Sequence, residues 1–126
     1  MKWGLNFKLS FHDVGCFCLI IVMIYKCQEA IPDNTDILIT HGPAFGTLDT
    51  VAGRPWDNLG CELLAQRIDR VRPKIHICGH IHSGYGYEFK DGTHFFNAAV
   101  LDERYEYTQK PMTFDWDKET NTIEFV

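Results

Sequence analysis

The chain has 126 residues, of which 45% are hydrophobic and 23% charged, and its formal net charge is -5. This length and apolar content suffice for one globular core and leave little room for a second. The acidic balance argues against nucleic acid as a partner, because a phosphate-binding surface normally shows as a clustered excess of lysine and arginine.

Residues 1–30 form an atypical N-terminal segment around a short apolar run at residues 14–25, VGCFCLIIVMIY. The run is shorter than the roughly 20 residues that span a bilayer as a helix, so we do not expect a membrane span. A signal or anchor core is one alternative, although no small-residue cleavage site follows the run. A buried strand or helix is a second alternative, and a third is that this stretch does not belong to the native domain.

The five cysteines, Cys16, Cys18, Cys27, Cys61 and Cys78, cannot all pair, and they form no CxxC motif. This pattern favours a reducing compartment, and we expect a cytoplasmic protein. The sequence does not predict an oligomeric state.

The second part of the chain, residues 31–126, reads as a domain that opens with a strand, a helix and a second strand. After a turn at Pro32, the first strand is predicted at residues 36–40 and a loop at residues 42–57. Asp57 or Asn58 is the expected N-cap of the helix, and Pro73 ends it. Its apolar positions recur at helical spacing: Leu59, Leu63, Leu64, Ile68 and Val71. With a strand at residues 74–78, this order predicts a βαβ unit with parallel strands.

Antiparallel strands are predicted for the remainder of the chain. Residues 85–89 alternate between apolar and polar, a Lys90-Asp91-Gly92 turn follows, and residues 94–97 return as the second strand of a β-hairpin. Two further strands are expected at residues 112–116 and 122–126. The fold class is therefore α/β, with one βαβ unit followed by antiparallel strands.

Histidines follow both strands of the βαβ unit. His41 comes directly after the first strand, and the second strand runs into Gly79-His80-Ile81-His82. Loops at the carboxyl ends of parallel strands carry most ligand sites in open α/β sheets. In an extended segment His80 and His82 point the same way, with Cβ atoms roughly 6 to 7 Å apart. Together with His41 they predict a metal site.

The other histidines have weaker support. His76 alternates out of phase with Ile75 and Ile77, so it is expected to be packed or to orient a ligand. His94 and His12 have no supporting context in the sequence.

Three segments together resemble the C-terminal half of the calcineurin-like metallophosphoesterases, and most of all their small phosphodiesterase branch. The segments are DILITHGPAFG at residues 36–46, GCELL at residues 60–64 and RVRPKIHICGHIHSGYGYEFKDGTHFFNAA at residues 70–99. The resemblance covers about residues 31–117. It implies half of an α/β/β/α sandwich, so residues 31–126 would form a partial calcineurin-like phosphoesterase domain.

The resemblance also implies a site and a reaction. His41 and His80 would bind one divalent ion, manganese, iron or zinc, and His82 would bind a second ion. A metal-activated hydroxide would hydrolyse a small-molecule phosphoester, acting as a phosphodiesterase or phosphatase. Asn97 would belong to the strand that supports the site. No further residue is assigned a catalytic role.

The upstream ligand motifs of the family, Asp-x-His, Gly-Asp-x-x-Asp or Asn, and Gly-Asn-His-Asp or Glu, do not occur in this sequence. We therefore expect this chain to hold at most one ion. We also expect it to be a truncated product or partial gene model, in which residues 1–30 replace the family's N-terminal half. The alternative function is a non-catalytic metal-binding or interaction fragment.

Overall fold

The computed structural model describes residues 30–126 and the backbone of residues 19–22. The principal elements, in chain order, are β1 (Leu19–Val22), β2 (Ile37–Thr40), β3 (Thr50–Val51), β4 (Arg54–Asn58), α1 (Glu62–Val71), β5 (Ile75–Cys78), the 3-10 helix η2 (His82–Gly84), β6 (Gly86–Lys90), β7 (Thr93–Asn97), β8 (Phe114–Asp117) and β9 (Thr122–Phe125).

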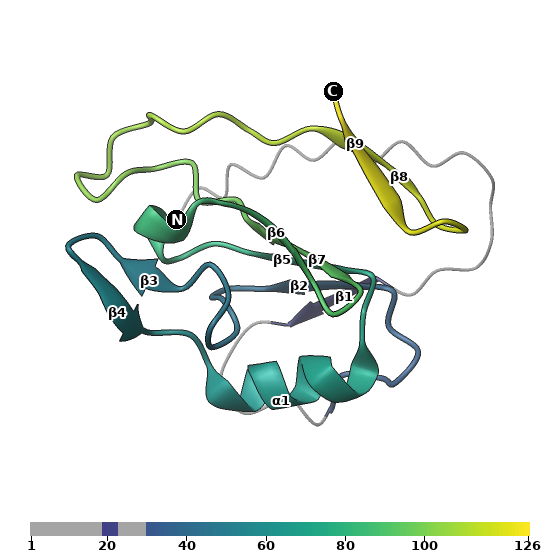
Figure 1. Ribbon diagram of the computed structural model, residues 1–126. Helices are drawn as coiled ribbons and strands as arrows, with labels where there is room; N and C mark the ends of the chain where they lie inside the picture. The colour runs from purple at the N-terminus through teal and green to yellow at the C-terminus, as the bar shows by residue number, and fades with distance from the viewer. Residues whose placement is uncertain (1–18, 23–29) are drawn as a thin grey trace.

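Five strands form one mixed sheet in the order β1-β2-β5-β7-β6 (Figure 1). Strands β1, β2, β5 and β7 run parallel to their neighbours, and β6 pairs antiparallel with β7. The predicted βαβ unit is confirmed, because β2 and β5 are parallel neighbours joined through α1. The predicted β6–β7 hairpin is also confirmed. Its second strand lies inside the mixed sheet, next to β5.

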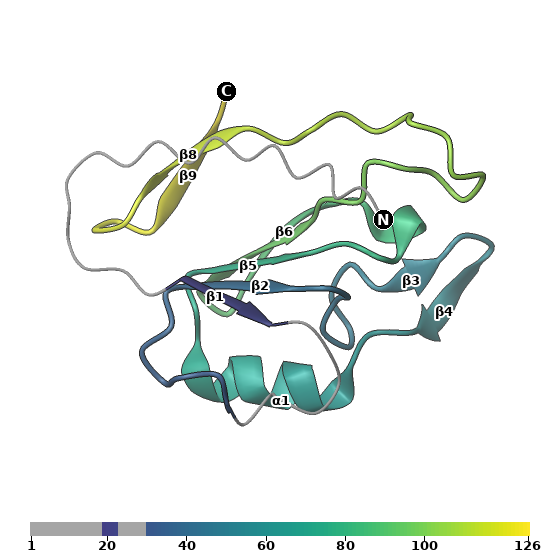
Figure 2. The ribbon, with the colours of Figure 1, turned by 180° about the vertical axis from the view of Figure 1, so that it is seen from behind.

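The molecule has three layers, with α1 below the sheet and the β8–β9 hairpin above it (Figures 1 and 2). The two sides of the sheet bury different apolar clusters. On the helix side, Leu38 and Phe95 pack with Leu64 and Ile68 of α1. On the other side, Ile37, Ile75, Ile77 and Phe96 pack with Phe114 and Trp116. Both predicted strands at the carboxyl end are present within one or two residues of their expected bounds.

Helix α1 begins later than predicted. Asp57 and Asn58 belong to β4, and the N-cap is Cys61, whose side chain makes no capping hydrogen bond. Leu59 lies before the helix, and Leu59 and Leu63 are 56% and 58% exposed, so their helical spacing does not place them on its buried face. Only Leu64, Ile68 and Val71 are buried. Spacing alone could not show that residues 54–58 pair with β3 instead of starting the helix.

The predicted loop at residues 42–57 contains a small hairpin, β3–β4, with an irregular register. The hydroxyl of Ser83, in η2, donates to the carbonyl of Thr50 at 2.8 Å and accepts from the Ala52 N–H at 3.0 Å. This side chain attaches the hairpin to the segment that carries His82.

Within the N-terminal segment, β1 pairs in parallel with β2 and extends the sheet by one strand. This agrees with the strand alternative for the apolar run at residues 19–22. Residues 1–18 and 23–29 lie outside the described part of the chain, so the other expectations for residues 1–30 are not addressed by the structure. Among the described residues, no helix is long and apolar enough to cross a bilayer.

Candidate metal centre

His41 and His80 meet beyond the carboxyl ends of β2 and β5. The Nε2 atom of His41 lies 3.1 Å from the Nδ1 atom of His80, and the ring centroids are 4.6 Å apart at 43°. The parallel pairing of β2 and β5 produces this contact, because it brings the two strand ends to the same edge. Partial burial lowers the pKa of His41, and the neighbouring His80 lowers it further.

The backbone around the two imidazoles is held by local contacts. The N–H of Gly79 donates to the carbonyl of His41 at 3.0 Å. A Cβ atom on Gly42 would lie 3.7 Å from Cδ2 of His80, so this glycine packs against the His80 ring. His80 itself adopts a left-handed backbone with φ 70°, which a non-glycine residue rarely does. Such strain at a candidate site requires support from its surroundings.

His82 lies in η2 instead of an extended strand, so the predicted simple alternation of His80 and His82 is wrong. Ile81, between them in the sequence, is buried. The Nδ1 atom of His82 lies 2.7 Å from the backbone carbonyl of Asp102. A carbonyl can only accept, so Nδ1 carries the proton and Nε2 of neutral His82 keeps its lone pair. This is the form in which a histidine can bind a metal through Nε2.

Three residues of the loop after β7 support His82, and no pattern in the sequence indicates these contacts. Besides the carbonyl of Asp102, the side chain of Gln109 donates from Nε2 to the carbonyls of His82 and Leu101, both at 3.1 Å. The ring of Tyr105 meets that of His82 edge to face, with centroids 5.1 Å apart. These partners lie 20 or more residues from His82, so spacing in the sequence could not identify them.

Asn97, at the end of β7, holds the segment between the two candidate ligands. It is fully buried and donates from Nδ2 to the carbonyl of Ile81 at 2.8 Å and to that of Leu48 at 3.1 Å. Gly84 allows this close packing, because a Cβ atom there would lie 2.1 Å from the Leu48 carbonyl oxygen. Asn97 therefore fixes the backbone from which His80 and His82 project.

The remaining described histidines are buried. His76 is 1% exposed, and burial lowers its pKa to about 3.

His94 is 4% exposed and lies in a network that the sequence did not reveal. Its Nε2 donates to the Asn121 carbonyl at 2.9 Å, and its Nδ1 accepts from the Tyr87 hydroxyl at 2.8 Å. His94 thus connects the sheet to the β8–β9 hairpin. His12 lies outside the described residues.

The imidazole nitrogens of His41 and His80 fit two coordination positions of one metal ion. Two imidazole nitrogens bound to zinc at tetrahedral angles lie about 3.3 Å apart, given Zn–N bonds of about 2.0 to 2.1 Å. The separation of 3.1 Å between His41 and His80 is close to this value. Among residues 30–126, however, no group of three or more His, Cys, Asp or Glu side chains is arranged to hold an ion. The described residues therefore supply a histidine pair, with His82 outside it.

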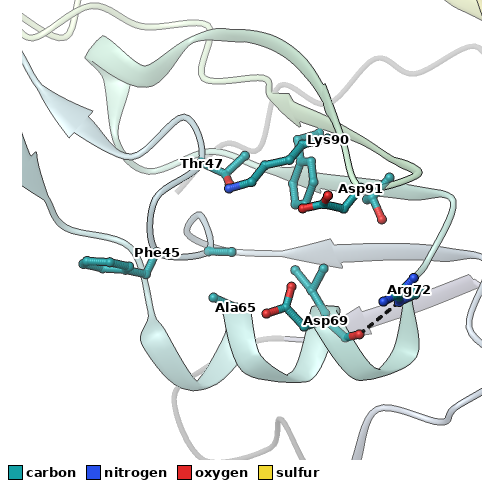
Figure 3. Close-up of a pocket in the computed structure, with 11 residues that line it drawn as sticks. Phe45, Thr47, Ala65, Asp69, Arg72, Lys90 and Asp91 are labelled. Atoms are coloured by element: carbon teal, nitrogen blue, oxygen red, sulfur yellow. Dashed lines mark hydrogen bonds between the residues drawn. The ribbon is translucent and has the colours of Figure 1, made fainter.

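A separate cavity of about 560 Å³ lies on the helix side of the sheet. Asp69 of α1 and the C-cap residue Arg72 face Lys90, the last residue of β6, and Asp91 of the following turn across it (Figure 3). The candidate metal ligands are not among the residues that line this cavity. The cavity and the histidine site are therefore distinct features of the molecule.

The fold and the site together define a mixed α/β protein with paired histidines beyond adjacent parallel strands. One solved crystal structure superimposes on 80% of this chain and 36% of its own length, with a TM-score of 0.50 and 18% sequence identity. At that identity the likeness shows the fold alone. No family profile matches the chain.

Curated relatives identify the family. The chain is 43% identical over 86 residues to metallophosphoesterase domain-containing protein 1 of Homo sapiens, and the match covers 68% of the chain and 26% of that protein. It is 35% identical over 95 residues to a UPF0046 protein of Caenorhabditis elegans, covering 75% of the chain and 32% of the relative. A second UPF0046 protein of this nematode is 38% identical over 96 residues, covering 75% and 24% respectively.

The chain belongs to the metallophosphoesterase family, as the resemblance predicted. It spans about a quarter to a third of the length of these curated relatives.

Proposed function

We propose that this chain is the C-terminal half of a metal-dependent phosphoester hydrolase domain, acting on a small-molecule phosphodiester or phosphomonoester. The contact between Nε2 of His41 and Nδ1 of His80 carries the proposal, because it brings two donors together at the separation expected for ligands of one ion. The name of the human relative, a metallophosphoesterase domain-containing protein, gives independent support.

In this proposal, His41 and His80 hold one divalent ion, manganese, iron or zinc, and His82 offers Nε2 to a second ion. The upstream ligand motifs are not in this sequence, so the chain by itself is proposed to hold at most one ion. Divalent ions in such a site supply an activated water as the nucleophile and neutralise charge on the phosphoryl oxygens.

The chain's own residues prepare the ligands. The carbonyl of Asp102 keeps the proton of His82 on Nδ1, and this leaves Nε2 free to bind. Asn97 binds the carbonyl of Ile81 and restrains the backbone on either side of it. The Gly79 N–H binds the carbonyl of His41 and joins the two strand ends. Preset ligands of this kind lose little entropy when an ion binds.

The domain boundary near residue 31 and a cytoplasmic location are also parts of the proposal. The cytoplasmic location rests on the cysteine pattern of the sequence, an odd number without a CxxC motif. In the structure the thiol of Cys78 is buried and forms no disulfide. Burial raises its pKa to about 12, so it is protonated and unreactive at neutral pH.

The experiment is a hydrolysis assay with manganese and bis-p-nitrophenyl phosphate. It compares the 126-residue chain, alone and mixed with a separately produced N-terminal half of the human relative, with the same samples carrying His80→Ala. We expect hydrolysis only in the mixture and a loss of at least tenfold in the variant. Hydrolysis that is insensitive to His80→Ala would contradict the proposal.

The alternative is a metal-binding fragment without turnover. It is favoured by the observation that the described residues bring together only two facing donors and no group of three. Zinc binding that is lost in His41→Ala, with no hydrolysis in any mixture, would support this alternative over the enzyme.

A further inference from the structure

His76 is a polar side chain in an apolar layer. The strand register places it between Leu38 of β2 and Phe95 of β7, two members of the cluster that packs against α1. Its ring meets that of Phe95 edge to face at 5.6 Å. An aliphatic residue at this position would bury apolar surface without the free-energy cost of removing a polar group from water. The imidazole must therefore be compensated by a hydrogen bond.

The compensating partner is the hydroxyl of Thr40, at the end of β2. Thr40 Oγ1 lies 2.8 Å from Nε2 of His76 and 2.7 Å from the carbonyl oxygen of Gly42. A threonine hydroxyl has one proton, and the carbonyl has none to offer, so that proton goes to Gly42. Oγ1 must then accept from His76, whose Nε2 carries the proton. The chain of hydrogen bonds has a fixed direction, from His76 to Thr40 to Gly42.

This series of hydrogen bonds ends at Gly42, beside the candidate ligands. Gly42 follows His41 directly, and a Cβ atom on it would lie 3.7 Å from the His80 ring. The carbonyl of the preceding residue, His41, accepts a hydrogen bond from the Gly79 N–H. The turn after β2 is therefore fixed at two successive carbonyls, one of them through His76. His76 itself is 1% exposed and is joined to this turn by its hydrogen bond with Thr40.

We propose that His76 is a positioning residue for the histidine site: through the Thr40 hydroxyl it fixes the Gly42 carbonyl and thereby the orientation of His41 toward His80. The inference rests on the proposed function, because the positioning role assumes that His41 and His80 are metal ligands. The hydrogen-bond chain and its direction stand independently of that function.

The chain offers a matched control. Like that of Thr40, the hydroxyl of Thr93 donates to a backbone carbonyl, that of Pro73, at 2.6 Å, and Thr93 is buried. It lies at the amino end of β7, away from the strand ends that carry His41 and His80. Thr93→Val removes one buried hydrogen bond, whereas Thr40→Val removes two part-buried ones, the bond from His76 and the bond to Gly42. Only Thr40→Val breaks the connection between His76 and Gly42.

The experiment has two readouts on the whole 126-residue chain. The first is the tautomer of His76 and the ring signals of His41 and His80, measured by nitrogen-15 NMR without metal. We expect Nε2–H for His76, and shifts of both ring signals in Thr40→Val and His76→Leu but not in Thr93→Val or Thr40→Ser.

The second readout is the dissociation constant for zinc. It should rise about 10-fold to 100-fold in Thr40→Val and His76→Leu, and less than about twofold in the two controls.

A double variant, His76→Leu with Thr40→Val, should bind zinc no more weakly than the worse of the single variants, because both interrupt one chain of contacts. An Nδ1–H tautomer for His76, equal effects of Thr40→Val and Thr93→Val, or additive losses in the double variant would each overturn the inference. If the unmodified chain binds no zinc, the proposed function fails in this chain, and the NMR readout alone decides the role of His76.

Discussion

The Nε2 atom of His41 lies 3.1 Å from the Nδ1 atom of His80, although the two residues are 39 positions apart in the sequence. The two nitrogens form a hydrogen bond with each other, and their separation also suits two ligands of one ion. An ion that binds between them therefore has to replace this hydrogen bond. Binding needs both imidazoles neutral, and the lowered pKa of His41 favours that state.

Removal of either member of this pair should weaken zinc binding. We expect His41→Ala and His80→Ala each to raise the dissociation constant at least tenfold, about 1.4 kcal/mol, in titration calorimetry. His82→Ala should have a smaller effect on the first ion, because His82 lies outside the pair. An effect of His82→Ala as large as that of His80→Ala would contradict the assignment of ligands.

Stability should depend on pH through His76. Its pKa is about 3 in the folded chain, against 6.5 for the ordinary group, so the unfolded chain binds the extra proton first as the pH falls. The stabilisation by neutral His76 is complete above about pH 6.5 and is lost as the pH falls toward 3. Between pH 7 and pH 5 the free energy of unfolding should decrease by about 2 kcal/mol from this group. Urea titrations at both pH values measure it, and His76→Leu should remove this part of the decrease.

Gly84 should tolerate no side chain. A Cβ atom there would lie 2.1 Å from the Leu48 carbonyl oxygen and 2.7 Å from Nδ2 of Asn97. We expect Gly84→Ala to cost about 3 kcal/mol, because backbone must shift to admit the methyl group. Gly79→Ala is the control, since its nearest atom would be 3.9 Å away, and it should change stability by less than about 1 kcal/mol. Similar losses for the two variants in urea denaturation would show that the close approach at Gly84 is not decisive.

Asn121 should anchor the β8–β9 hairpin. Its side chain accepts from Trp116 Nε1 at 3.1 Å and donates to the Gly92 carbonyl at 2.9 Å, and its backbone is left-handed with φ 52°. Asn121→Ala should cost about 2 to 3 kcal/mol, and Asn121→Asp, which keeps the acceptor, about 1 kcal/mol. Thermal unfolding measures both. Thr120→Ala, in the same exposed turn, should change stability by less than about 0.5 kcal/mol. A cost for Asn121→Ala no greater than that of Thr120→Ala would contradict this role.

Cys78 should resist alkylation in the folded chain. It is 5% exposed, and burial raises the pKa of its thiol to about 12, with a further contribution from Asp49. We expect iodoacetamide at pH 8 to leave the peptide that contains Cys78 unmodified, as judged by mass spectrometry, until urea unfolds the chain. Modification in the native state at the rate of a small thiol would exclude this burial.

The sequence by itself determined the main elements of residues 31–126 and the family. Apolar runs, turn residues and spacing identified β2, α1, β5 and the β6–β7 and β8–β9 hairpins, because each pattern is local. The succession of His41 and Gly-His-x-His after two strands carried the resemblance to the metallophosphoesterases. Adjacent parallel strands then predicted that His41 and His80 would meet, since both strands end at one edge.

Only the tertiary structure decided how the histidines are held. The β3–β4 hairpin, the late start of α1 and the exposure of Leu63 depend on pairing between residues that no local pattern connects. The partners of His82 and His76, namely Asp102 and Thr40, lie 20 and 36 positions away. Hydrogen bonds of this kind arise from chain segments that folding brings together. The residue types suggested a metal site, and their tautomers and orientation follow from the packing of the sheet and its loops.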